Sequence, residues 1–100
     1  MLNSKQKKYL KGLAHHLKPV VQIGKDDLKE SVVEAVKKEL LHHELIKIKI
    51  GQNSGVNKKN APEELAEAAG AEVVQLIGKT IILFKQNIKL PKDTRISLPK

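Results

Sequence analysis

The sequence feature that most constrains the fold is a glycine turn between an apolar segment and a helical one. Residues 20–23 (VVQI) have the composition of a short buried strand, Gly24 follows, and apolar residues recur at helical spacing from Leu28. Residues 45–50 (LIKIKI) then alternate, which predicts a strand with isoleucines on one face and lysines on the other. The turn at Gly24 directs backbone N–H groups and a helix N-terminus outward, where an anion can bind.

A first helix is expected before this unit. Asn3 or Ser4 can cap it, and Pro19 ends it. Gly12 lies inside this helix, where glycine costs about 1 kcal/mol relative to alanine, so either close packing or close approach of a ligand is expected there. The apolar residues that recur at helical spacing, and that we expect to face the core, are Leu10, Leu13, Ala14 and Leu17.

Two more helices are expected. Asp26 or Asp27 can cap the second, which runs to about Leu41. The third has Pro62 in its first turn and ends at Gly70, because proline is tolerated at a helix start and glycine favours a helix end.

The second half of the chain predicts a hairpin and a tail. Residues 72–77 and 80–85 are apolar strands joined at Gly78 and Lys79, and the polar tail 86–100 has Ile96 and Leu98 to pack on an edge. The predicted order is therefore α-β-α-β-α-β-β. We expect one α/β domain over residues 1–100, of the α+β two-layer kind, with helices packed on a mixed four-stranded sheet.

The charge of the chain favours a nucleic-acid backbone as partner. The formal net charge is +8, and all the basic residues are lysine except Arg95. Lysine acts as a point charge, which suits phosphate contacts better than reading of base edges. Single-strand RNA binders commonly stack bases on aromatic rings, and this chain has only Tyr9 and Phe84 to offer. We therefore expect phosphate and shape recognition with little sequence preference.

Catalysis and metal binding are not expected. A metal-dependent hydrolase built on the histidine pairs 15–16 and 42–43 is one alternative, but adjacent helical residues point about 100° apart and no cysteine accompanies them. Glu44 has no partner carboxylate at a suitable spacing, so we expect it to make a structural hydrogen bond. No cofactor is implied. The absence of cysteine fits a reducing cytoplasm, and no apolar run is long enough for a signal peptide or a membrane span.

Six segments together resemble the YhbY-type CRM domain, named for chloroplast RNA splicing and ribosome maturation. They cover nearly the whole chain and are residues 10–15 (LKGLAH), 18–21 (KPVV), 43–49 (HELIKIK), 70–71 (GA), 74–80 (VQLIGKT) and 96–99 (ISLP). The resemblance implies a fold like the C-terminal domain of translation initiation factor three. It also implies RNA binding, and, for stand-alone bacterial members, association with precursors of the large ribosomal subunit.

The resemblance extends to a G-x-x-G loop similar to that of KH domains. Gly24, Lys25 and Asp26 match its first three positions, and Asp27 stands where the family has the second glycine. The Asp27 carboxylate is expected to oppose phosphate, whereas its ability to cap a helix preserves the loop's shape. Replacing it, Asp27→Gly, should tighten RNA binding at a small cost in stability.

We expect a cytoplasmic RNA-binding protein that assists assembly of the large ribosomal subunit without chemistry of its own. In this reading the first-helix cations lie near the Gly24 turn, and the strand cations form a second contribution. The expected RNA-binding residues are Lys8, Lys11, His15, Lys18, Gly24, Lys25, Lys29, Lys47, Lys49, Lys79 and Lys85. The alternatives are a non-specific, nucleoid-type DNA-binding protein and an adaptor that contacts a ribosomal protein through a sheet edge.

Overall fold

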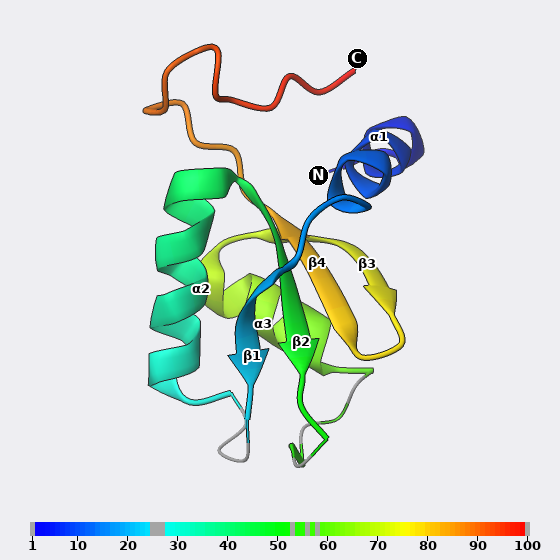
Figure 1. Cartoon of the computed structure of the whole chain (residues 1–100), viewed down its shortest axis with the longest axis vertical. Helices are drawn as coiled ribbons and strands as arrows, with labels where there is room; N and C mark the ends of the chain where they lie inside the picture. The colour runs from blue at the N-terminus through cyan, green and yellow to red at the C-terminus, as the bar shows by residue number, and fades with distance from the viewer. Residues whose placement is uncertain (1, 25–27, 53, 56, 58, 100) are drawn as a thin grey trace.

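The computed structural model describes residues 2–24, 28–52, 54, 55, 57 and 59–99, and the predicted element order is confirmed (Figure 1). The elements are α1 (Ser4–Ala14), β1 (Pro19–Ile23), α2 (Glu30–His43), β2 (Leu45–Ile50), α3 (Ala61–Ala69), β3 (Glu72–Ile77) and β4 (Thr80–Phe84). Lys25, Asp26 and Asp27, three of the four residues of the G-x-x-G position, lie outside the described residues.

The four strands form one mixed sheet in the order β1-β2-β4-β3. β1 pairs with β2 in parallel, whereas β4 is antiparallel to both of its neighbours. The parallel pair requires a crossover connection, which α2 supplies. The hairpin between β3 and β4 turns at Gly78, whose φ of +57° is a conformation that glycine adopts without steric cost.

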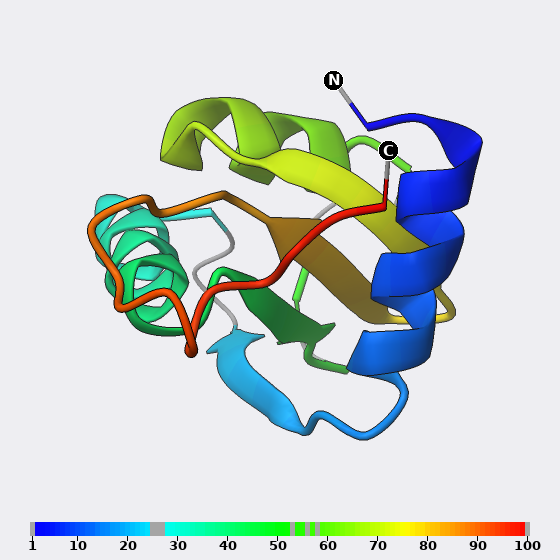
Figure 2. The same ribbon diagram turned by 90° about the horizontal axis from the view of Figure 1, so that it is seen from above.

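The two faces of the sheet are covered to different extents (Figure 2). α2 and α3 cover one face completely, and their apolar residues pack with Ile46, Ile48 and Ile81 of the central strands. α1 packs on the opposite face, where Leu10 and Ala14 contact a second cluster that includes Phe84. The helices predicted to pack on the sheet therefore lie on both of its faces, with α2 and α3 on one face and α1 on the other.

Register explains why part of the α1 face stays open. Across this face Lys47 lies opposite Ile82, which lies opposite Gln75 on β3. The next row toward the hairpin turn holds Lys49 and Thr80, and β2 presents its lysines there because its isoleucines face the other helices. α1 covers the row that holds Leu45 and Phe84. The rows that hold Lys47 and Lys49 are therefore open to solvent.

The predicted ends of α1 and α2 need correction. Asn3 caps α1 as predicted, in a capping box with Gln6. The helix ends at Ala14, however, because Pro19 disfavours helical backbone before it and the intervening residues form a turn toward the sheet edge. Leu13 and Leu17, predicted to face the core, are each 38% exposed. α2 begins at Glu30 with Lys29 as its N-cap and continues past Leu41 to His43.

The tail is held against the body of the protein by Glu44, which is fully buried. Its carboxylate oxygens accept hydrogen bonds from the backbone N–H groups of Asn87 and Ile96, each at 2.6 Å. Ile96 and Leu98 were predicted to pack on an edge, and the structure packs them against the cluster that includes Leu10 and Ala14 of α1. Figure 2 shows the tail passing from the end of α2 across the sheet to α1. Among the described residues, no helix has the length and apolar character needed to cross a membrane.

Candidate functional site

A hollow of about 380 Å³ lies between α1 and the open part of the sheet. We call it the basic cleft. Its lining residues are Lys11, Gly12, His15, Lys47, Gln75, Ile77 and Ile82. Lys11 and His15 come from α1 and its C-cap, and Lys47 comes from β2. The fold thus brings together three predicted binding residues from two separate parts of the sequence.

Local structure explains this convergence. Lys11 and His15 are four residues apart, so they lie one above the other on the same side of the α1 helix. Lys47 follows Leu45 by two residues, so both side chains point to the α1 face of the sheet. A Cβ atom on Gly12 would have no described heavy atom within 4 Å, so tight packing does not require this glycine.

A second hollow of about 450 Å³ continues along the open face toward the hairpin turn. Its lining residues are Gln22, Lys49, Ile50, Gly51, Gln52 and Lys79. Lys49 lies two positions after Lys47 on β2, about 7 Å further along the same face. Predicted residues Lys47, Lys49 and Lys79 therefore extend the basic cleft into one polar stripe.

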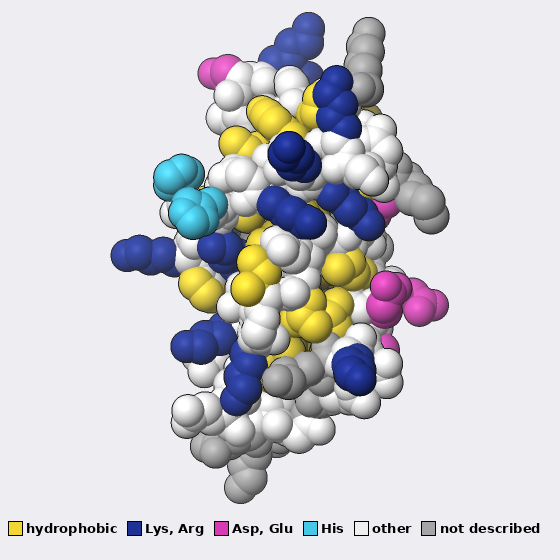
Figure 3. Space-filling view, turned by 90° about the vertical axis from the view of Figure 1, so that its right-hand side faces the viewer, with side chains coloured by type: hydrophobic (Ala, Val, Ile, Leu, Met, Phe, Trp, Pro, Cys, Tyr) yellow, Lys and Arg dark blue, Asp and Glu magenta, His cyan; other side chains and the backbone are white. Residues whose placement is uncertain are grey.

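Acidic residues are distributed unevenly among the elements of the fold. The α1, β1, β2 and β4 elements contain no aspartate or glutamate, β3 contains Glu72, and α2 and α3 contain three glutamates each. Figure 3 shows lysine and arginine side chains spread between hydrophobic ones, with acidic side chains at the margins of the view. A surface that concentrates one sign of charge attracts a polyanion and orients its approach.

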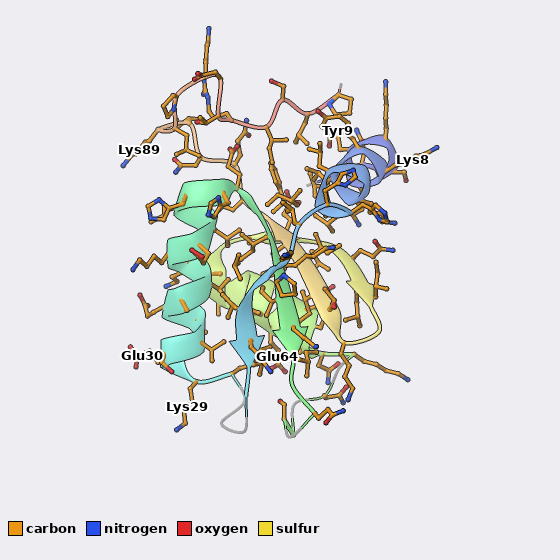
Figure 4. All side chains as sticks on the ribbon, in the orientation of Figure 1. Lys8, Tyr9, Lys29, Glu30, Glu64 and Lys89 are labelled. Carbon is orange, nitrogen blue, oxygen red and sulfur yellow. The ribbon has the colours of Figure 1, made fainter. Side chains whose placement is uncertain are left out.

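The predicted binding residues at the start of α2 lie far from those of α1 (Figure 4). Lys8 extends from α1 at one end of the molecule and Lys29 lies at the other end (Figure 4). The expectation that the first-helix cations lie near the Gly24 turn is therefore wrong. The extended β1 carries the chain across the sheet at about 3.3 Å per residue, so its two ends are far apart. Gly24 is exposed directly after β1, and Lys25 lies outside the described residues.

Lys85 lies on a different side from the other strand lysines. It follows Phe84, so alternation directs it toward the α2 and α3 face. Its ammonium donates a hydrogen bond to the carbonyl oxygen of Ala69 at 3.4 Å, at the C-terminal end of α3. A cation at this position interacts favourably with the negative C-terminal end of the α3 helix dipole. Lys85 therefore has a structural contact of its own.

Sequence reasoning did not predict the apolar groove that lies beside the basic cleft. It has a volume of about 440 Å³ and is lined by Leu13, Leu17, Lys18, Val20, His43, Leu45, Ile46 and Ile96. Lys18, a predicted binding residue, lies here rather than in the basic cleft. Helical spacing assigned Leu13 and Leu17 to the core. Leu13 lies inside α1 and Leu17 lies beyond its end, but each is 38% exposed and lines an open surface instead.

The histidine pairs do not assemble a metal centre with other described residues. The rings of His15 and His16 contact each other edge to face, with centroids 5.4 Å apart. Within the part of the chain that the structure describes, no group of three or more His, Cys, Asp or Glu side chains could hold a metal ion. His43 is the last residue of α2.

Comparison with known proteins gives one consistent family. The model of the CRS1/YhbY (CRM) domain matches residues 2–85. The "Probable RNA-binding protein YqeI" of Bacillus subtilis is 35% identical over 99 residues, covering 99% of this chain and 100% of that protein. An "RNA-binding protein" of Haemophilus influenzae is 37% identical over 99 residues, which are 99% of this chain and 96% of the relative.

A solved structure agrees with the fold. The solution structure of the hypothetical protein SAV1595 from Staphylococcus aureus superimposes with a TM-score of 0.81 at 40% identity. The match covers 99% of this chain and 100% of that one. The similarity therefore includes the tail, which lies beyond the residues that the family model matches.

Proposed function

Because the chain belongs to the CRS1/YhbY (CRM) domain family, we propose that it binds RNA on the open face of its sheet. The observation that carries the proposal is the basic cleft, where Lys11, His15 and Lys47 converge from α1 and β2. Two relatives along nearly the full length of the chain are named as RNA-binding proteins. The chain's net charge of +8 supports the same partner.

The proposed contacts are mainly to phosphate. Lysine ammonium groups bind phosphate oxygens as point charges and do not fix a base identity. Aromatic stacking contributes little, because Phe84 is 3% exposed and Tyr9, which is 42% exposed, is the chain's only other Phe, Tyr or Trp residue. Binding is therefore electrostatic, salt-dependent and tolerant of sequence.

We further propose that the RNA is a precursor of large-subunit ribosomal RNA and that the protein acts in the cytoplasm as an assembly factor without catalysis. This finer assignment rests on the family resemblance of the segments at 10–15, 43–49 and 74–80. A contact with a ribosomal protein is compatible with the uncovered edge of β1, the first strand of the sheet.

A salt titration tests the RNA proposal directly. If Lys11, Lys47, Lys49 and Lys79 each neutralise one phosphate, log affinity should fall with log salt at a slope of about −3 to −4. Lys11→Gln and Lys47→Gln should each reduce that slope by about one. Lys89→Gln, the matched control, removes an exposed tail lysine far from the cleft and should leave the slope unchanged (Figure 4). Affinity that does not change with salt would contradict the proposal.

The finer assignment requires an experiment in cells. Crosslinking followed by sequencing of the bound nucleic acid should recover large-subunit ribosomal RNA in excess of its abundance. Competition between RNA and DNA duplexes of equal length at fixed salt separates the DNA-binding alternative, because contacts to the 2′-hydroxyl favour RNA. Preferential recovery of messenger RNA, or equal competition by DNA, would reject the ribosomal assignment.

A further inference from the structure

The apolar groove adjoins the basic cleft. The segment from Lys11 to Lys18 contributes to both, and β2 contributes Leu45 to the groove and Lys47 to the cleft. Leu45 and Lys47 are two residues apart on the same face of β2, which separates the two hollows by about 7 Å along the strand. The groove and the cleft are therefore neighbouring hollows along β2.

The groove has a mostly aliphatic lining. Leu45 and Ile46, at 4% and 1% exposure, form the buried floor, and Leu13, Leu17 and Val20 remain exposed along the walls. Its volume of about 440 Å³ lies within the roughly 300–1,000 Å³ typical of pockets that take small molecules. Lys18 and His43 are the polar side chains that line it.

We propose that this groove receives an unpaired nucleobase of the bound RNA. The inference rests on the proposed function and adds to it, because phosphate contacts alone do not distinguish paired from unpaired RNA. A base turned out of its helix would bury its apolar faces against the aliphatic walls. Its flanking phosphates would lie near Lys18 on one side and the basic cleft on the other.

Charge and continuity favour a nucleotide over a peptide as the occupant. The groove opens beside the lysine-rich side of the molecule rather than beside the glutamates of α3. The chain has few rings on which a base could stack, so an aliphatic groove supplies the apolar contact that aromatic residues supply elsewhere. Because its lining side chains offer few hydrogen-bonding groups, the groove selects unpaired nucleotides without reading which base they carry.

Three RNA hairpins test the proposal with the full chain. The first is fully paired, the second has one unpaired uridine in its stem, and the third has an abasic ribose in place of that uridine. The wild-type protein should bind the second hairpin about tenfold more tightly than the other two, the size expected for burial of one base. The double variant Leu17→Ser, Val20→Thr should lose this preference while binding the paired hairpin as the wild type does.

The matched control is Leu41→Ser, which replaces a leucine that is 54% exposed and lies outside the groove lining. It should keep the full preference for the unpaired uridine. Equal wild-type affinity for all three hairpins, or a preference that persists in the groove variant, would overturn the proposal. Absence of salt-dependent binding to every hairpin would instead overturn the proposed function itself.

A measurement on the unaltered protein removes any dependence on how the variant folds. The methyl NMR signals of Leu13, Leu17 and Val20 should shift with the uridine hairpin and not with the abasic one. The same shifts with both hairpins would overturn the assignment to a base. Shifts caused by an acidic, leucine-containing peptide but by none of the hairpins would assign the groove to a protein partner and overturn it as well.

Discussion

Glu44 shows how much one residue can determine in this fold. It has a φ of +59°, a conformation that side-chain-bearing residues rarely adopt, and it occupies the junction between α2 and β2. Its carbonyl oxygen accepts a hydrogen bond from the Lys85 N–H, and its carboxylate accepts two from the tail. A buried carboxylate is stable only with such partners, so Glu44 has the structural role expected from the sequence.

Replacing this carboxylate, Glu44→Gln, should lower the free energy of unfolding by about 1–3 kcal/mol. A glutamine can accept from one tail N–H but places an NH₂ group against the other. Urea unfolding measures the loss, and hydrogen exchange of the Asn87 and Ile96 amides should accelerate. Glu39→Gln, a control in the middle of α2, should change neither. Unaltered amide exchange in Glu44→Gln would contradict the assigned contacts.

Gly12 offers a test of how closely RNA approaches α1. Because a Cβ atom there meets no described heavy atom within 4 Å, Gly12→Ala should raise the free energy of unfolding by about 0.5–1 kcal/mol. If the RNA backbone lies against this part of the basic cleft, the added methyl group should weaken RNA binding. Thermal melting and a binding titration measure the two effects separately. Greater stability with unchanged affinity would show that RNA does not touch Gly12.

At the residue scale, the sequence predicted part of the candidate site. Lys11, His15 and Lys47 were predicted to bind RNA, and the structure brings their side chains into one cleft. Gln75 was missed, because only the pairing of β3 with β4 places it opposite Ile82 and therefore in the lining of the same cleft as Lys47. Pairing partners from distant segments leave no local signal in a single sequence.

At the scale of elements, strands were easier to predict than helix ends. β2 was predicted over its full extent because strict alternation has an unambiguous period. The predicted end of α1 was wrong because the turn before Pro19 continues the apolar spacing of the helix. The predicted start of α2 was wrong because several residues could serve as its cap. The apolar groove was missed because helical spacing assigned Leu13 and Leu17 to the core, whereas each is 38% exposed.

The alternation of β2 and β4 yields a prediction about lysines that look equivalent in the sequence. Lys47→Gln combined with Lys49→Gln should reduce the salt slope of RNA binding by about two, because both side chains lie on the open face. Lys85→Gln should leave the slope unchanged and slightly lower stability, because its ammonium contacts Ala69. Binding titrations at several salt concentrations compare the variants. Equal slopes for the Lys85 variant and the β2 double variant would contradict the two-sided arrangement.

At the scale of the whole molecule, the tail belongs to the folded domain although the family model ends at residue 85. Gln6 donates its side-chain N–H to the carbonyl oxygen of Pro99 at 3.1 Å, across 93 positions of sequence. Ile96 and Leu98 join the cluster under α1. The sequence predicted that the tail packs on an edge, but only the structure identifies Glu44 as the group that holds it.

A chain ended after residue 85 should lose more than about 3 kcal/mol of unfolding free energy, because apolar contacts and two hydrogen bonds to a carboxylate disappear. In that shortened chain Glu44→Gln should be neutral or stabilising, since it now removes a charge without partners. A double-mutant cycle by urea unfolding measures the coupling. Additive losses from the two changes would mean that Glu44 and the tail stabilise the fold independently.

The hydrogen bond between Gln6 and Pro99 joins residues that are synthesised at very different times. A ribosome makes the N-terminus first, so α1 is finished long before the strands and tail residues on which it packs. Until the last of these emerges, Leu10 and Ala14 have no complete surface to cover, and Lys11 has no Lys47 beside it. A nascent chain therefore carries the cations of the basic cleft without the cleft itself. The cleft therefore forms only after β2, β3 and β4 have been synthesised and have paired.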